Sequence, residues 1–422
     1  MLVASLAVGV VIGHSFLARF SAAFSAAASL LFLSSAQGAD WLHYRGPSGN
    51  GVTTEKIPAT LPKTGPRQLW KASLGTGTSA VTVSGGRAFS MGNAGKKDTV
   101  FCLDAKSGKV IWRHEYPQEL DKRMFEGGTA TTPTVDGERV YTVSHQGDLF
   151  CLDAASGRQV WFKHFQKDFG GRRPQWGFAG SPTIEGNLVL LDVGGEGAST
   201  VALDKTTGNL VWKSGNDEPG YASVSVANVG GKRTAIVFKA THLVGLDVKD
   251  GRELWRTPWK TSYDVNAATP LVVGDRIFIS SGYGSGCALI SINGGKASEV
   301  WRNKNLKAHV NTAAVWEGHV YGPDDQTGGG KLACVDLNNG SLKWSEKSVP
   351  GGAVIIASGK LIALSERGEL VIAEASPAGF QPLSRAQVLG GRCWVQPTLA
   401  DGRLFVKNNQ GELVCLSMAP HE

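Results

Sequence analysis

Polar and aromatic side chains gather in the loop-like segments between the apolar stretches of this sequence. A Trp beside Arg and Gln can stack on a planar ligand while the polar groups orient it. We predict no catalytic and no metal-binding residue. The ligand-binding candidates are Arg173, Gln175, Trp176, Glu196, Tyr221, Asn266, Tyr283, His309, Asn311 and Trp394.

Several of these residues have a structural alternative. Trp176 and Trp394 would either stack on a ligand or plug a channel by packing. Arg173 would meet an acidic ligand or a neighbouring carboxylate, or remain a solvated loop charge. Glu196 lies among glycines, where a turn carboxylate is the alternative to a metal or cofactor ligand.

Known catalytic constellations are absent from the sequence pattern. No Ser/His/Asp or Cys/His set can be assembled, although His309 and Asn311 suit the wall of a polar pocket. Asp324 and Asp325 form a weak calcium candidate, because calcium needs six or more oxygen ligands. The Gly-rich loops lack the strand, Lys and helix of a phosphate loop, so we interpret them as turns.

Composition points to a repetitive β protein. The chain has 422 residues, of which 42% are hydrophobic, 19% are charged and 55 are Gly. One ordinary compact core rarely grows this large, whereas a repeat architecture adds residues without thickening the core. The formal net charge is only +7. Because no segment combines clustered Lys and Arg with aromatic residues, we expect no nucleic-acid partner.

The first 38 residues resemble a signal peptide. They contain an apolar run over 20–33, one Arg (Arg19), no acidic residue, and small residues at 34–38. We therefore expect cleavage and export to the periplasm or medium, with no transmembrane domain afterwards. An uncleaved membrane anchor is the alternative.

The six cysteines do not suggest a disulfide framework. Cys102, Cys151 and Cys334 each stand two residues before an Asp of a recurring motif, and Cys415 stands two before Ser417. Such a recurring position suits a small buried apolar residue. We expect mostly free thiols.

A repeat organises nearly the whole chain. Its form is Asp-x-x-Ser/Thr-Gly-x-x-x-Trp, as in Asp104 to Trp112 and Asp153 to Trp161. Further copies begin at Asp204, Asp247, Ser291, Asp336, Glu374 and Ser417, with intervals from Asp104 onward of 49, 51, 43, 44, 45, 38 and 43 residues. These intervals match the length of a four-stranded propeller blade.

Each position of the motif has a mechanical role. Apolar alternation before the Asp indicates a strand with a buried face. The Asp side chain can bond its own backbone in a turn, and Gly adopts positive φ. A second hairpin precedes the one formed by the motif, and its turn lies for example at Asp136-Gly137. Four strands per unit, repeated radially, predict an all-β, eight-bladed β-propeller of antiparallel blades.

The chain ends indicate how the ring closes. The last copy stops before its own Trp, whereas Trp70 has no hairpin before it. We predict that the strand around Trp70 completes the last blade and hides its edges. The expected organisation is a signal peptide at 1–38, an N-terminal extension at 39–63 and the propeller at 64–422.

Propeller topology predicts that the candidate residues share one face. Links from the last strand of one blade to the first strand of the next converge around the central channel. Most candidates lie on these links, and Glu196 and Tyr283 lie on links between second and third strands. The sequence therefore predicts a concave mouth on this face.

The repeat resembles those of PQQ-dependent (pyrroloquinoline quinone) alcohol dehydrogenases and of the BamB-like lipoprotein propeller of outer-membrane assembly. A closer resemblance is to exported PQQ-like propellers of planctomycetes and verrucomicrobia. This family is defined by sequence, so the resemblance implies no particular activity. The segments that carry this resemblance are Trp41–Pro47, Phe169–Gly177, Ser281–Leu289, Val320–Gly322 and Trp394–Phe405.

The resemblance leaves two functions open. Quinoprotein dehydrogenases resemble one another in an adjacent Cys-Cys ring, a calcium site, a catalytic Asp and a quinone-facing Arg. This sequence has no Cys-Cys pair and no Cys-x-x-Cys-His. We expect a binding or scaffold module that engages a protein, peptide or small molecule at the channel face, and we expect the chain itself to be a monomer. The alternative is a PQQ-dependent alcohol or sugar dehydrogenase, whose implied cofactor is PQQ with calcium. In that case PQQ would lie over Trp176 or Trp394, with Arg173 near the quinone oxygens.

Overall fold

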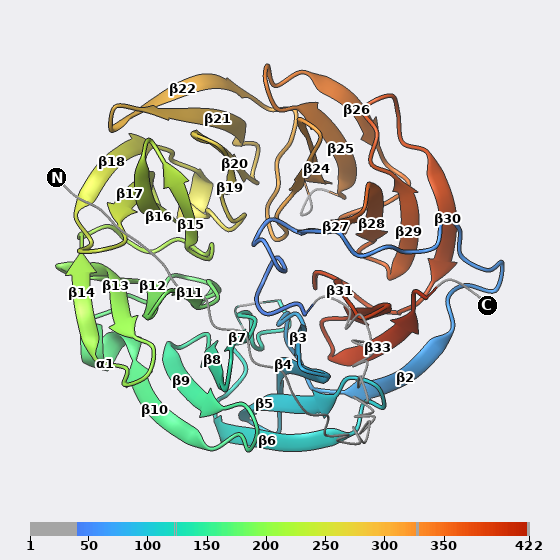
Figure 1. Cartoon of the computed structure of the whole chain (residues 1–422), viewed down its shortest axis with the longest axis horizontal. Coiled ribbons are helices and arrows are strands. Elements are labelled where there is room, and N and C mark those ends of the chain that lie inside the picture. Colours follow the sequence, from blue (N-terminus) through green and yellow to red (C-terminus); the bar gives the residue numbers. More distant parts are fainter. Residues whose placement is uncertain (1–39, 122, 124, 326–328, 420–422) are drawn as a thin grey trace, which may run out of the picture. The chain divides into compact units, whose positions relative to one another are not determined.

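Eight antiparallel sheets are arranged in a ring (Figure 1). The computed structural model describes residues 40–121, 123, 125–325 and 329–419. This architecture confirms the predicted eight-bladed propeller. The predicted signal peptide lies outside the described residues. Within the described part of the chain, no helix is long and apolar enough to cross a membrane.

Seven blades take their four strands consecutively from the sequence. Blade 1 contains β3 (Thr82–Ser84), β4 (Arg87–Ala94), β5 (Lys97–Asp104) and β6 (Val110–Pro117), and blade 2 contains β7 (Thr134–Asp136), β8 (Arg139–Val143), β9 (Asp148–Asp153) and β10 (Gln159–His164). Blade 3 contains β11 (Thr183–Glu185), β12 (Leu188–Gly195), β13 (Ala198–Asp204) and β14 (Leu210–Ser214), and blade 4 contains β15 (Ser225–Val229), β16 (Lys232–Phe238), β17 (His242–Asp247) and β18 (Glu253–Pro258). Blade 5 contains β19 (Leu271–Val273), β20 (Arg276–Ser281), β21 (Gly286–Asn293) and β22 (Lys296–Asn303). Blade 6 contains β23 (Ala314–Trp316), β24 (His319–Asp324), β25 (Lys331–Asp336) and β26 (Leu342–Glu346). Blade 7 contains β27 (Ala353–Ala357), β28 (Lys360–Leu364), β29 (Glu369–Glu374) and β30 (Pro382–Gln387).

Blade 8 combines the two ends of the chain. It contains β31 (Thr398–Ala400), β32 (Arg403–Lys407), β33 (Glu412–Ser417) and, as outer strand, β2 (Gln68–Ser73). Trp70 on β2 pairs with Cys415 on β33. The predicted closure is therefore confirmed. The short helical segments are α1 (Phe165–Phe169) and a 3-10 turn at Ser262–Asp264.

The repeat motif forms the turns and blade contacts for which its residues are suited. The Asp104 carboxylate accepts hydrogen bonds from the Ser107 amide and hydroxyl, both at 2.7 Å. Gly108 has φ +71°, and a Cβ there would lie 2.6 Å from the Trp70 ring. The Trp70 indole N–H donates to the carbonyl of Ala105 at 3.1 Å, which joins blade 8 to blade 1. The same residues thus shape the turn and bind the next blade.

All six cysteines are buried and free, as expected. Cys102, Cys151, Cys334 and Cys415 lie on the third strands of their blades. Burial raises the pKa of each of these thiols to about 12. They therefore act as buried apolar groups.

Hydroxyl groups link neighbouring inner strands around the channel. In four blades, the residue two positions before the inner strand donates its amide N–H to the hydroxyl at the same position of the next blade. These bonds are Ala80 to Thr132 at 3.1 Å, Thr132 to Ser181 at 2.9 Å, Ser181 to Ser223 at 2.9 Å and Thr269 to Thr312 at 2.9 Å. A second set runs from the hydroxyls of Thr134, Thr183 and Ser225 to the carbonyls of Pro182, Val224 and Pro270. We call both sets the hydroxyl belt.

Part of the N-terminal extension lies inside the ring. Trp41 and Val83 exchange backbone hydrogen bonds at 2.8 Å, so the extension begins on the inner strand of blade 1. Strand β1 (Val52–Thr53) then pairs in parallel with β27 and adds a fifth strand to blade 7. Figure 1 shows this segment in blue at the centre of the ring, before the chain runs outward to β2.

Arg45 of the extension completes the belt where blade 7 has no hydroxyl. Gly351 and Ala353 occupy the belt positions of this blade. The buried guanidinium donates to the carbonyls of Thr312 (3.0 Å), Ala313 and Val354 (3.4 Å) and to Oε1 of Gln396 (2.7 Å). These acceptors belong to the inner edges of blades 6, 7 and 8. One side chain therefore joins three blades.

Lys407 joins blade 8 to blade 1 from within the protein. Its buried ammonium donates to the carbonyls of Gly77, Ser79 and Met91 at 2.9, 3.1 and 3.1 Å. Burial lowers the pKa of Lys407 to about 7. In the unfolded chain the lysine keeps its ordinary pKa of about 10.4.

Lys407→Met is expected to flatten the pH dependence of stability between about pH 7 and pH 10. In this window the unfolded chain binds more protons than the folded protein, so Lys407 makes the free energy of unfolding rise with pH. Below about pH 7 both states are protonated and this dependence disappears. Urea denaturation at pH 6, 7.5 and 9 measures the effect, with exposed Lys71→Met as control. Equal slopes in the wild type and Lys407→Met would contradict it.

Candidate functional site: the mouth of the channel

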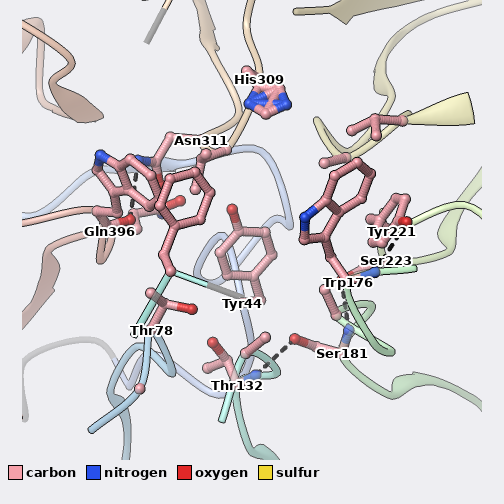
Figure 2. A pocket seen from close by; sticks show the side chains of 18 of the residues that line it. Tyr44, Thr78, Thr132, Trp176, Ser181, Tyr221, Ser223, His309, Asn311 and Gln396 are labelled. Atoms are coloured by element: carbon pink, nitrogen blue, oxygen red, sulfur yellow. Dashed lines mark hydrogen bonds between the residues drawn. The ribbon is translucent and has the colours of Figure 1, made fainter. Parts of the chain in front are cut away.

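A pocket of about 200 Å³ opens where the links between blades converge. Residues before seven of the eight inner strands contribute to it, together with Tyr44 from the extension and Tyr283 from a hairpin of blade 5. Figure 2 shows Tyr44 standing between Trp176 on one side and Asn311 and Gln396 on the other. The pocket thus lies on the face that the sequence predicted.

The floor of the pocket is polar and uncharged. Thr132, Ser181 and Ser223 of the hydroxyl belt line it, as does Gln396, whose Oε1 accepts from Arg45. A belt hydroxyl that accepts an amide N–H still has its own proton to donate. Figure 2 places the Tyr44 hydroxyl in the space between these groups and His309. The floor therefore offers several neutral donors and acceptors.

One wall of the pocket includes Trp176, Tyr283 and His309, and Tyr263 at the rim connects Trp176 to Tyr283 by edge contacts. The ring centroids of Trp176 and Tyr263 lie 6.4 Å apart with an angle of 90° between the ring planes. Those of Tyr263 and Tyr283 lie 5.3 Å apart at 69°. Tyr283 in turn lies 4.6 Å from His309 at 78°. Burial lowers the pKa of His309 to about 4, so its imidazole is neutral at pH 7. This wall is apolar on its ring faces and carries no charge.

The opposite wall consists of Phe125 and Trp394. Their rings meet edge to face at 4.7 Å and 81°. The Arg392 guanidinium covers both, 4.8 Å from the Trp394 ring and 5.3 Å from the Phe125 ring. Trp394 is thus packed on one side and faces the pocket on another. Phe125 remains 63% exposed, which is unusual for so large an apolar ring.

Two tyrosines of the mouth lie on backbone that favours glycine. Tyr263, Asp264 and Tyr283 have φ values of +64°, +54° and +51°. A non-glycine residue in this region costs about 1–3 kcal/mol, and such residues cluster at functional sites. Tyr263 is also 67% exposed. An exposed ring held on strained backbone is more consistent with binding than with packing.

Charged groups at the rim neutralise one another. Glu126 accepts from Arg392 at 2.7 Å and from the Asn409 side chain at 3.0 Å. Asp121 accepts from Arg123 at 2.8 Å and from Arg173 at 2.6 Å, and these bonds hold the pKa of Asp121 well below its usual range. Glu126 is the one charged side chain among the described residues that line the pocket.

The structure brings six of the ten predicted site residues together in this lining. They are Trp176, Tyr221, Tyr283, His309, Asn311 and Trp394. The other four lie outside it. Arg173 is paired with Asp121, Gln175 and Glu196 are exposed, and Asn266 is buried, where it donates to the carbonyls of Lys239 and Ala240.

Sequence reasoning did not select Tyr44, the belt hydroxyls or Gln396. One signal for the belt was present, because a proline follows four of these positions, in Thr132-Pro133, Ser181-Pro182, Thr269-Pro270 and Gln396-Pro397. In these four blades the proline stands one position before the inner strand, and the residue before the proline lines the pocket. Tyr44 had no such signal, since it reaches the floor from a segment outside the repeat.

The described neighbours of Asp324 are cations and do not form a calcium site. Lys307 and Lys331 lie 2.9 and 3.3 Å from its carboxylate, which they neutralise. Among the described residues no group of three or more His, Cys, Asp or Glu side chains is placed to hold a metal ion.

Comparison with known proteins assigns the chain to a family. The family model described as outer membrane protein assembly factor BamB matches residues 55–125 and 118–346. The chain belongs to this family of PQQ-repeat propellers. No curated protein sequence gave a match.

Solved structures with this fold include BamB and quinoprotein propellers. BamB from Moraxella catarrhalis is 14% identical, with a TM-score of 0.60 over 83% of this chain and 99% of that one. The quinohemoprotein alcohol dehydrogenase from Comamonas testosteroni is 13% identical, with a TM-score of 0.66 over 91% of this chain and 81% of that one. The computationally designed Ika8 protein is 11% identical, with a TM-score of 0.58 over 86% and 100%. At these identities the likeness shows the shared fold alone.

The pocket does not fit PQQ, the cofactor that a quinoprotein propeller implies. PQQ carries carboxylates, which bind best to Arg or Lys. No Arg or Lys lines the pocket among the described residues, and the guanidinium of Arg173 already bonds Asp121. The free and buried cysteines provide no disulfide ring beside Trp176 or Trp394.

Proposed function

We propose that this BamB-family propeller is a binding module whose ligand enters the pocket at the channel mouth. The observation that carries the proposal is the composition of the lining, in which aromatic rings surround a floor of neutral hydroxyl and amide groups. A rigid ring can hold such loops in place for binding without catalysis. The ligand is a neutral small molecule or a neutral side chain of a partner protein or peptide.

A PQQ-dependent dehydrogenase is the competing function, and calorimetry separates the two. Titration of the purified protein with PQQ, with and without calcium, is expected to give no binding heat. Micromolar binding that disappears in Trp176→Ala or Arg173→Ala would overturn the proposal in favour of the oxidoreductase.

A thermal-shift screen tests binding directly. Among neutral small molecules and short peptides, we expect at least one class that raises the melting temperature of the wild type but not of Trp176→Ala. Phe162→Ala is the matched control, because Phe162 is a half-exposed ring on the outer strand β10, away from the pocket. If no compound stabilises the wild type selectively, the binding role is wrong.

We also propose that the chain is exported to the periplasm or medium and is of the planctomycete and verrucomicrobial type. The apolar segment before residue 39 and the motif Trp41–Pro47 support this proposal.

A further inference from the structure

Deepening the proposed binding role, we propose that the pocket at the channel mouth binds one ring of a neutral carbohydrate. This inference rests on the proposed function and names its ligand class. A pyranose ring has apolar C–H faces, which stack on aromatic rings, and a circumference of hydroxyl groups, which both donate and accept hydrogen bonds. The pocket offers the complement of each.

The volume of the pocket limits the ligand to one ring. At about 200 Å³ it is smaller than the roughly 300–1,000 Å³ of sites for drug-sized molecules. The aromatic rings stand on its two walls, and the polar groups lie beneath them. A longer chain would therefore place one unit in the pocket and let the next contact the exposed rings of Phe125 and Tyr263 at the rim.

The polar groups favour a ligand with several hydroxyls over an aromatic side chain. Thr132, Ser181 and Ser223 present hydroxyls from three successive blades, so their positions follow the curve of the channel. A Phe or Trp side chain in this place would remove water from these groups without replacing its hydrogen bonds. Each polar group left without a hydrogen bond therefore disfavours an aromatic side chain at this place.

Buried polar atoms without partners are also found beside the pocket. The ring nitrogens of His309, the indole N–H of Trp394 and the hydroxyl of Thr269 make no hydrogen bond within the described part of the chain. All three residues line the pocket. Such groups are rare in folded proteins and call for a partner. These atoms have almost no accessible surface, so they mark the polar character of the wall and are not themselves ligand contacts.

The charge of the lining excludes acidic ligands. Its single charged residue, Glu126, is a carboxylate, and Arg392 and Asn409 occupy both of its oxygens. A phosphate or uronic acid would enter a site with no cation to receive it, and a desolvated charge without a partner is costly. The pocket therefore selects neutral sugars over acidic ones.

The test is calorimetric titration of the full chain with trisaccharides. Neutral probes are maltotriose, cellotriose, xylotriose and triacetylchitotriose, and trigalacturonic acid is the acidic probe. We expect at least one neutral trisaccharide to bind and the acidic one to bind at least tenfold more weakly. Tyr263→Gly is expected to weaken neutral binding at least tenfold, whereas Phe162→Ala leaves it unchanged.

Tyr263→Gly separates loss of binding from loss of fold. Because Tyr263 has φ +64°, glycine relieves strain there, and the melting temperature should stay equal or rise. Failure of every neutral trisaccharide while another neutral compound still binds through Trp176 would overturn the carbohydrate inference and leave the binding role. Tight binding of the acidic probe alone would overturn the inference as well. If no compound of any class binds, both the inference and the proposed function are wrong.

Discussion

Arg45→Met is expected to lower the free energy of unfolding by about 3–5 kcal/mol, because each buried carbonyl that loses its donor costs about 1–3 kcal/mol. Arg45 donates to carbonyls of Thr312, Ala313 and Val354 and to the Gln396 side chain. Methionine keeps much of the volume and removes the donors. Urea denaturation of the purified variant, followed by circular dichroism, measures the loss.

Exposed Arg158→Met is the matched control, since Arg158 lies on an outer turn of blade 2. It should change stability by no more than about 0.5 kcal/mol. The bridging role of Arg45 would be wrong if both variants unfolded at the wild-type urea concentration.

Replacing Gln68–Ser73 by a Gly/Ser sequence of equal length is expected to destabilise the whole propeller by more than about 4 kcal/mol. Loss of a buried Trp alone costs about 3–5 kcal/mol. Trp70 is buried between blades 8 and 1, where its ring lies 5.8 Å from Phe405 and its N–H binds Ala105. The change also exposes the edge of β33, so we expect oligomers in size-exclusion chromatography.

The control for this replacement keeps Trp70 and changes only exposed positions, Gln68→Ser and Lys71→Ser. It should melt within a few degrees of the wild type and remain in the same chromatographic peak. A Gly/Ser variant that melts like the wild type would show that ring closure by β2 contributes nothing to stability.

Most of the fold could be predicted because a blade is a local structure. The spacing from Asp104 to Asp153 and onward sets the blade length, and each turn depends on contacts within a few residues, such as Asp104 with Ser107. The unpaired Trp70 and the truncated last repeat predicted the closure for the same reason. What the repeat could not predict was the course of the extension, which lies outside it.

The site could be predicted only in part. Propeller topology places the links between blades around one mouth. For this reason Trp176, His309 and Trp394, which lie on such links, were predicted as site residues, and all three line the pocket. Topology does not say which side of a link faces the channel. Gln175, one residue before Trp176, is exposed, and Asn266 bonds backbone inside blade 4. Side-chain direction within a loop depends on φ, ψ and packing that no repeat pattern specifies.

The sequence by itself determined the number of blades, their turns, the closing strand and the face on which the mouth lies, because these follow from short-range patterns repeated eight times. Only the tertiary structure decided that Tyr44 reaches the floor, that Arg45 replaces missing hydroxyls in blade 7, and that Asp121 and Glu126 at the rim bond arginines. The reason is distance along the chain: Arg45 and Gln396 are 351 residues apart. Contacts of this kind exist only after the ring has closed.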